Sequence, residues 1–165
     1  MKYFLVTLGC QMNIADSERV ERVLQESGYS PAETEEEAEV LGILSCSVRQ
    51  KPIDKVYSKA HKWNKWKKKR DVVTFVSGCI LPKDKGPFLK IFDLVFPMSE
   101  LHTLPELIRS YGVVTRAGLR AIPLNDYIHQ FWAIKPKYQS PFEAFVPIQN
   151  GCDKFCTYCA VPFTR

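Results

Sequence analysis

The chain has 165 residues, of which 45% are hydrophobic and 12% aromatic, a size and composition that exclude a disordered protein and fit one ordinary globular domain. Its first apolar run, residues 2–8, is too short for a secretory signal or a membrane span, so we expect a cytoplasmic monomer without membrane contact. The net charge of +5 is concentrated in residues 55–70, which carry eight cations and no acid and favour a polyanionic partner.

The first part of the chain predicts two strands separated by a helix. Residues 2–8 are almost continuously apolar, which is typical of a buried strand. Asn13 follows as a candidate N-cap, and apolar residues at helical spacing predict a helix that ends at Gly28. The acidic residues 33–39 are expected to form a short solvated helix, and residues 40–44 the second strand.

Two more helices and two more strands are expected further along the chain. Pro52 suits the first turn of a helix, which we expect to end near Arg70. Residues 72–76 predict a third strand and residues 94–96 a weaker fourth. The spacing Thr103-x-x-Glu106 is that of a capping box, which predicts the start of the last helix.

Strands that alternate with helices predict an α/β fold with a doubly wound, mostly parallel sheet. Cys10, Cys46 and Cys79 each follow one of the first three expected strands, at separations of about one strand–helix unit. Ligands of such sheets bind beyond the carboxyl ends of the strands, so we predict that the three thiols meet there and hold a metal centre. The alternative is that they are three ordinary buried cysteines.

A second group of cysteines, Cys152, Cys156 and Cys159, has the spacing C-x3-C-x2-C. A zinc site closed by protein uses four ligands, and so does a ferredoxin cluster. Three thiolates on one loop therefore favour a 4Fe–4S cluster with one iron open to an outside molecule. A zinc loop or a disulfide remnant is the alternative.

This spacing, with Tyr158 just before the third cysteine, resembles the signature of radical S-adenosylmethionine enzymes, and residues 151–165 resemble its form in methylthiotransferases. The similarity to the N-terminal domain of the methylthiotransferase family extends to residues 8–13, 46–50, 55–56, 78–79 and 101–107. Residues 11–13 and 46–49 are most similar to the branch that modifies isopentenylated adenosine in tRNA. Leu44 and Phe96 depart from residues common in the family, which bears on the branch more than on the chemistry.

The resemblance implies a division of the chain into three parts. Residues 1–114 correspond to the methylthiotransferase N-terminal domain, and residues 115–138, which lack clear periodicity, to a linker. Residues 139–165 correspond to the first strand, expected at 142–149, and the cluster loop of a truncated radical S-adenosylmethionine (β/α) barrel. Most of the barrel would lie outside the chain, so we expect the chain alone to be inactive.

The chemistry that the resemblance implies requires two 4Fe–4S clusters and S-adenosylmethionine. The cluster that cleaves S-adenosylmethionine would be held by Cys152, Cys156 and Cys159, with Tyr158 beside the cofactor. The cleavage would produce a radical that removes a hydrogen atom from C2 of the adenine ring. Cys10, Cys46 and Cys79 would hold an auxiliary cluster that presents sulfur. The implied partners are tRNA, S-adenosylmethionine and a reducing electron donor.

The basic residues Lys67, Lys68, Lys69 and Arg70, near two tryptophans, are candidate RNA contacts, although an amphipathic helix packed on the sheet would show the same pattern. His61, His102 and His129 stand apart from the cysteines and are not expected to be ligands. Three alternative functions remain open: a sister branch that modifies threonylcarbamoyl-adenosine in tRNA or a ribosomal protein, a non-catalytic iron–sulfur module, and a zinc-binding protein.

Overall fold

The computed structural model describes residues 1–111 and 127–164 and contains one five-stranded sheet in the order β2-β1-β3-β4-β5. Every neighbouring pair of strands is parallel, which confirms the predicted α/β class. The elements in chain order are β1 (Lys2–Thr7), α1 (Gln11–Glu26), β2 (Ser30–Pro31), β3 (Val40–Cys46), α2 (Gln50–Trp66), β4 (Val73–Cys79), α3 (Pro82–Leu89), β5 (Leu94–Val95), the 3₁₀ helix η1 (Met98–Thr103), α4 (Leu104–Ser110), α5 (Tyr127–Ala133) and the 3₁₀ helix η3 (Val161–Phe163).

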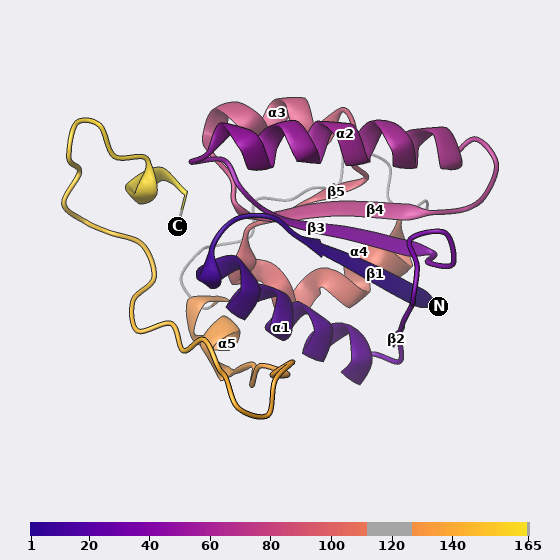
Figure 1. The fold of residues 1–165 in the computed structure, drawn as a ribbon, viewed down its shortest axis with the longest axis horizontal. Helices are drawn as coiled ribbons and strands as arrows, with labels where there is room; N and C mark the ends of the chain where they lie inside the picture. The colour runs from indigo at the N-terminus through magenta and orange to yellow at the C-terminus, as the bar shows by residue number, and fades with distance from the viewer. Residues whose placement is uncertain (112–126, 165) are drawn as a thin grey trace.

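Helices cover both faces of the sheet, with α2 and α3 on one face and α1, α4 and α5 on the other (Figure 1). The central strand β3 is buried along its whole length, and its side chains alternate between the two cores. Val40 and Leu44 pack in the core that includes α1, and Leu41 and Ile43 pack in the core that includes α2. Burial on both faces explains why this strand is almost purely apolar.

The described helices include none that is both long and apolar enough to cross a membrane.

Helix α1 begins earlier than the sequence predicts, so the expectation that Asn13 caps it is wrong. Cys10 has the extended backbone of an N-cap, and Asn13 lies in the first turn of the helix. The chain can turn into the helix immediately after β1 because Gly9 has a φ of 149°. This early start places Cys10 at the N-terminus of α1.

The expectation of a solvated short helix at residues 33–39 is also wrong, because this segment forms turns and Glu35 is buried. Its carboxylate accepts hydrogen bonds from Lys59, Lys62 and the indole of Trp63, all on α2. The turn therefore places the carboxylate of Glu35 against the basic helix α2. The charges within residues 33–39 alone do not predict this contact.

Helix α3 was not expected, since Gly86 and Pro87 interrupt its sequence, yet Pro82 occupies its first turn, where proline is tolerated. The helix predicted to start at Thr103 is confirmed by α4, but the capping box is not formed, because the Thr103 hydroxyl donates to the carbonyl of Glu100 at 2.7 Å. Thr103 instead ends η1, and α4 continues directly from it. Similarly, α2 ends at Trp66 rather than near Arg70.

The stretch expected to be a linker contains helix α5, in which Phe131 is buried in the α1-side core. Arg19 of α1 lies over the rings of Phe131 and Trp132, with its guanidinium carbon 5.2 and 5.3 Å from their centroids. The first part of the expected linker, residues 115–126, lies outside the described residues.

The barrel strand expected at residues 142–149 is not formed in this structure. Phe142 and Ile148 are almost fully exposed. A strand requires a hydrogen-bonded neighbour, and no described strand pairs with this segment.

Candidate metal centres

The structure brings Cys10, Cys46 and Cys79 to the carboxyl edge of the sheet, as the sequence predicts. Cys46 and Cys79 are the last residues of β3 and β4 and are direct partners in the parallel ladder. Cys10 is the N-cap of α1, which starts at the same edge. Helices α2 and α3 also begin there, so three helix N-termini, which favour negative charge, surround the three thiols. The three residues are called the cysteine rim below.

Two glycines allow the three segments of the cysteine rim to pack closely. A Cβ atom on Gly9 would lie 2.2 Å from Oδ1 of Asn13 and 3.1 Å from Cβ of Cys46. A Cβ atom on Gly78, whose φ is 108°, would lie 2.4 Å from the carbonyl oxygen of Ser45. Only glycine fits at either position without displacing backbone or a buried side chain.

The chemistry of the cysteine rim fits an iron–sulfur cluster with three protein ligands. Cys46 and Cys79 are only 7% and 8% exposed, and Cys10 is partly buried. Thiolates are the ligands that iron–sulfur clusters use, and Gly9 and Gly78 allow the segments that carry the three cysteines to lie close together. Among the described residues, no three His, Cys, Asp or Glu side chains are grouped so as to hold a single metal ion.

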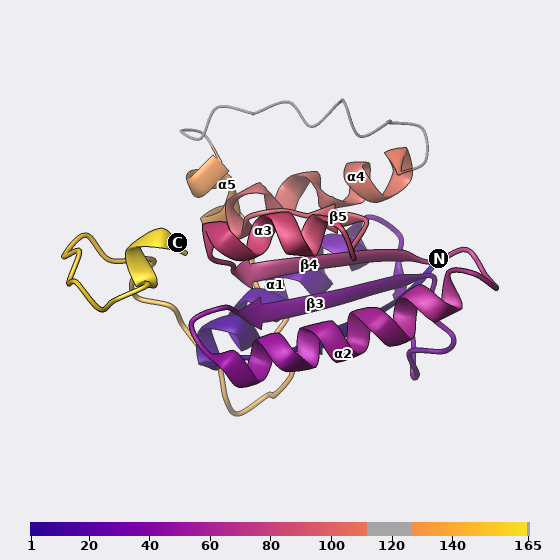
Figure 2. The same ribbon diagram turned by 90° about the horizontal axis from the view of Figure 1, so that it is seen from above.

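The second group of cysteines lies on an irregular loop beyond the same edge of the sheet (Figures 1 and 2). Cys156 is exposed, and Cys152 and Cys159 are partly buried. The amide of Cys159 donates to the carbonyl of Cys156 at 2.9 Å, so these two share one turn. Tyr158 is 91% exposed. The structure thus brings these residues together only through their closeness in sequence.

The basic segment is less free than its sequence suggests, because acids from elsewhere pair with it. Lys59 and Lys62 form ion pairs with Glu35, and Lys67 forms one with Asp93. Burial acts to raise the pKa of Glu35, but the hydrogen bonds from α2 outweigh it and hold that pKa below its ordinary value. Arg70 donates to the backbone carbonyl of Glu35 at 3.0 Å.

Lys68 and Lys69 remain exposed, at the end of the molecule opposite the cysteine rim. Helix α2 starts at the carboxyl edge of the sheet and runs back along it (Figure 2), so its 17 residues separate the two regions by about 25 Å. Trp63 is buried, as expected for an amphipathic helix. Trp66 has the ammonium of Lys62 4.6 Å from its ring centroid and the guanidinium of Arg70 at 4.9 Å.

The histidines lie apart from both groups of cysteines in sequence, and two of them are described. His61 is exposed, and burial lowers the pKa of His102, which favours its neutral form. The side chain of His129 lies outside the described part of the chain.

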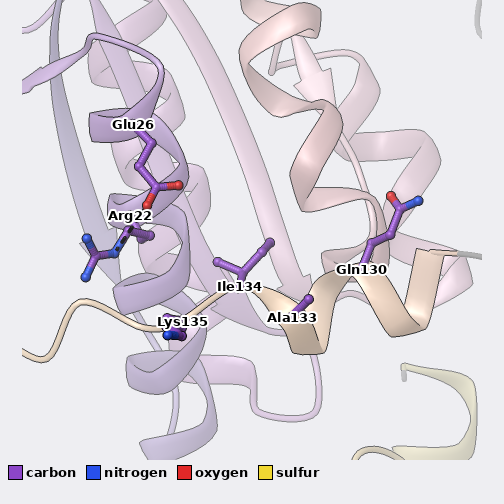
Figure 3. A pocket seen from close by; sticks show the side chains of 6 residues that line it. All are labelled: Arg22, Glu26, Gln130, Ala133, Ile134 and Lys135. Carbon is purple, nitrogen blue, oxygen red and sulfur yellow. Dashed lines mark ion pairs between the residues drawn. The ribbon is translucent and has the colours of Figure 1, made fainter.

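An open pocket of about 430 Å³ lies between α1 and the end of α5 (Figure 3). Arg22 and Glu26 line one side and form an ion pair, and Gln130, Ala133, Ile134 and Lys135 line the other. None of the cysteines lines this pocket.

Comparison with known proteins places this arrangement in a family. Residues 2–96, which include the whole cysteine rim, match the profile of the uncharacterized protein family UPF0004. The chain belongs to this family. Curated relatives are tRNA-2-methylthio-N(6)-dimethylallyladenosine synthases: that of Sulfurihydrogenibium sp. is 38% identical over all of this chain and 39% of the relative. The synthase of Hydrogenobaculum sp. is 39% identical with the same coverage, and that of Thermotoga petrophila is 36% identical over 37% of its length.

The chain therefore spans less than two fifths of these relatives and corresponds to their N-terminal portion. All six cysteines lie within the aligned length, whereas only those of the cysteine rim lie within the UPF0004 match. Sequence analysis missed the role of Asn13 and the two glycines at the cysteine rim. The adjacent Gly9-Cys10 and Gly78-Cys79 pairs were the available signal.

Proposed function

We propose that this chain is the N-terminal portion of a cytoplasmic tRNA methylthiotransferase that acts on isopentenylated adenosine. The observation that carries the proposal is that three cysteines from separate strand–helix units lie at the carboxyl edge of the sheet, where Gly9 and Gly78 allow their segments to pack closely. The names of the curated relatives support the substrate class. A sister branch with another substrate remains the second candidate, since Leu44 and Phe96 depart from common family residues.

In this proposal Cys10, Cys46 and Cys79 hold an auxiliary 4Fe–4S cluster, and Cys152, Cys156 and Cys159 hold the cluster that binds S-adenosylmethionine beside Tyr158. When bound, such clusters supply the reducing electron and the open iron positions that radical cleavage of S-adenosylmethionine and sulfur insertion require. The protein's own part is to hold three thiolates at a fixed edge and to present the second trio on an accessible loop.

The proposed division of the chain keeps residues 1–114 as the N-terminal domain and residues 139–165 as the start of the radical S-adenosylmethionine core. Residues 115–138 connect them. Burial of Phe131 supports a connection whose second half packs on the N-terminal domain instead of swinging free.

Anaerobic reconstitution tests the two cluster sites separately. We expect about eight iron atoms and eight sulfides per chain, falling to about four in either Cys46→Ala or Cys156→Ala. His61→Ala, at an exposed position, is the control and should keep all eight. Zinc in place of iron, or iron that neither cysteine substitution lowers, would contradict the proposal.

Binding of S-adenosylmethionine separates an enzyme portion from a non-catalytic module. Its addition to the longer protein of which this chain is the proposed N-terminal portion should change the EPR spectrum of the reduced cluster. The change should also appear in Cys46→Ala, where the loop trio (Cys152, Cys156 and Cys159) is intact. An unchanged spectrum in both would favour the non-catalytic module.

RNA contact at Lys67, Lys68, Lys69 and Arg70 is proposed chiefly for the two exposed lysines, because Lys67 and Arg70 already have protein partners. Lys68→Glu/Lys69→Glu should weaken tRNA binding and reduce its log–log salt slope by about 2. Lys51→Glu/Lys55→Glu makes the same charge change at the opposite end of α2, where both lysines are also exposed. Equal effects of the two pairs would mean that only net charge matters.

A further inference from the structure

Asn13 is a fully buried polar residue whose side chain lies among the three segments that carry the cysteine rim. Its Oδ1 accepts the backbone N–H of Cys10 at 3.2 Å and lies 3.6 Å from Sγ of the same residue. Its Nδ2 donates to the carbonyl oxygen of Ser45 at 3.1 Å. One carboxamide thus joins the start of α1 to the end of β3.

The third segment lies beside the same carboxamide. Gly78 is the ladder partner of Ser45, and a Cβ atom built on Gly78 would lie 3.0 Å from Nδ2 of Asn13. Asn13 therefore bonds to Cys10 itself and to the residue before Cys46, and it lies beside the residue before Cys79. The side-chain hydrogen bonds of the described residues include no other that links two of these segments.

Only a carboxamide satisfies both partners at this position. The N–H of Cys10 requires an acceptor and the carbonyl of Ser45 requires a donor, which fixes the orientation of the amide. An apolar residue would remove the acceptor of the Cys10 amide and one donor to the Ser45 carbonyl in a buried site. An aspartate would keep the acceptor for Cys10 but place an oxygen against the oxygen of Ser45.

We propose that Asn13 is a positioning residue that sets the spacing of the three thiols before a cluster binds. The inference rests on the proposed function of the cysteine rim. A role beyond general stability is indicated by the partners of Asn13: its two side-chain hydrogen bonds to backbone end at a cysteine and at the immediate neighbour of a cysteine. Groups that orient metal ligands in this way tune how tightly the metal centre is held.

The test uses the chain with Cys152, Cys156 and Cys159 replaced by alanine, so that iron reports on the cysteine rim alone. In this parent, Asn13→Ala should lose iron to a chelator about 10- to 100-fold faster. The reduced cluster should also show a changed EPR spectrum. Asn64→Ala is the matched control, because Asn64 likewise donates its Nδ2 to a backbone carbonyl, that of Ile91, at 3.0 Å, near the far end of α2.

Urea unfolding of the metal-free proteins separates positioning from stability. Each alanine substitution removes the donor to one buried carbonyl, and Asn13→Ala also leaves the Cys10 amide without its acceptor. If lost stability alone mattered, iron loss would follow the fall in unfolding free energy in both variants. Should Asn13→Ala fail to fold, Asn13→Asp carries the test, since it keeps the acceptor for the Cys10 amide and loses only the donor to the Ser45 carbonyl. It should lose iron faster than the control.

Iron loss from Asn13→Ala and Asn13→Asp at the parent rate would overturn the inference while leaving the cluster proposal intact. A parent chain that binds no iron would overturn both, because the cluster site itself would then be absent.

Discussion

The two cysteine groups have the same number of thiols but are assembled by different means. The cysteine rim is built from residues 36 and 33 positions apart. The parallel ladder pairs buried Cys46 with buried Cys79, and Asn13 joins the segment of partly buried Cys10 to that of Cys46. The loop trio spans eight residues, and its members are exposed or partly buried. The rim exists only if the domain folds, whereas the loop trio exists in any conformation of residues 152–159. Under the proposed function, this difference separates a site that folding preforms from one that a ligand or further structure must order.

The largest effect that would sharpen this comparison is expected from Gly78→Ala. The new Cβ would meet the carbonyl oxygen of Ser45 at 2.4 Å, and the φ of 108° is strained for any L-residue. We expect the unfolding free energy, measured by urea denaturation, to fall by about 2–5 kcal/mol.

Two other glycines separate the contributions to that loss. Gly28 has a φ of 88° but open space around its Cβ position, so Gly28→Ala should show the backbone strain alone, about 1 kcal/mol. Gly86 has open space and lies in α3, where alanine should be neutral or stabilising by about 0.5–1 kcal/mol. A Gly78→Ala loss no larger than that of Gly28→Ala would mean that the cysteine rim is not closely packed.

Alkylation of the thiols tests the difference in preorganisation directly. In the metal-free native chain, exposed Cys156 should react with iodoacetamide on the order of 100-fold faster than buried Cys46 and Cys79, which require local opening. Peptide mapping by mass spectrometry follows each cysteine separately. In concentrated urea the three rates should converge, and similar rates in the native chain would refute a buried rim.

Sequence patterns predicted β1, β3, β4 and β5, the parallel sheet and the edge where the first three cysteines meet, because a buried strand has a nearly continuous apolar run. They missed the two-residue β2, and the strand expected at residues 142–149 is not formed. They failed where distant partners decide the local structure. Glu35 is buried because α2 supplies Lys59, Lys62 and Trp63, and nothing within residues 33–39 shows this. Asn13 has the residue type of an N-cap, and only the folded structure shows that its side chain donates to the carbonyl of Ser45, 32 residues away.

The structure of the connecting segment, residues 134–139, is likewise decided by distant partners. Residues 134–139 have no periodicity of their own, yet they lie on α1, where the amide of Lys137 donates to the carbonyl of Glu18 at 3.1 Å. Lys137 also donates its Nζ to Gln25 at 2.9 Å, and Gln139 donates its Nε2 to Glu21 at 3.3 Å. These hydrogen bonds hold the segment that connects the N-terminal domain to the loop trio, and their partners lie on the polar face of α1.

The smallest predicted effect concerns this connection. Burial raises the pKa of Glu21 above its ordinary value, against the hydrogen bond from Gln139 and the charge of Lys137. A carboxyl group with a raised folded-state pKa costs stability when it is ionised. Glu21→Gln should therefore stabilise the chain at pH 7, by no more than about 0.5 kcal/mol for a partly exposed group, because a glutamine oxygen can still accept from Gln139.

The gain should shrink as the pH falls from the raised folded pKa towards the ordinary value of 4.5, since protonation then removes the same charge from Glu21. Urea unfolding at pH 7 and pH 5 measures both values. Glu26→Gln, one turn further along α1 in an exposed ion pair with Arg22, is the control for a general change in charge. If Glu21→Gln destabilises the chain at pH 7, the ionised carboxylate holds the connecting segment in place, and the loop trio is tethered more firmly than the comparison with the rim implies.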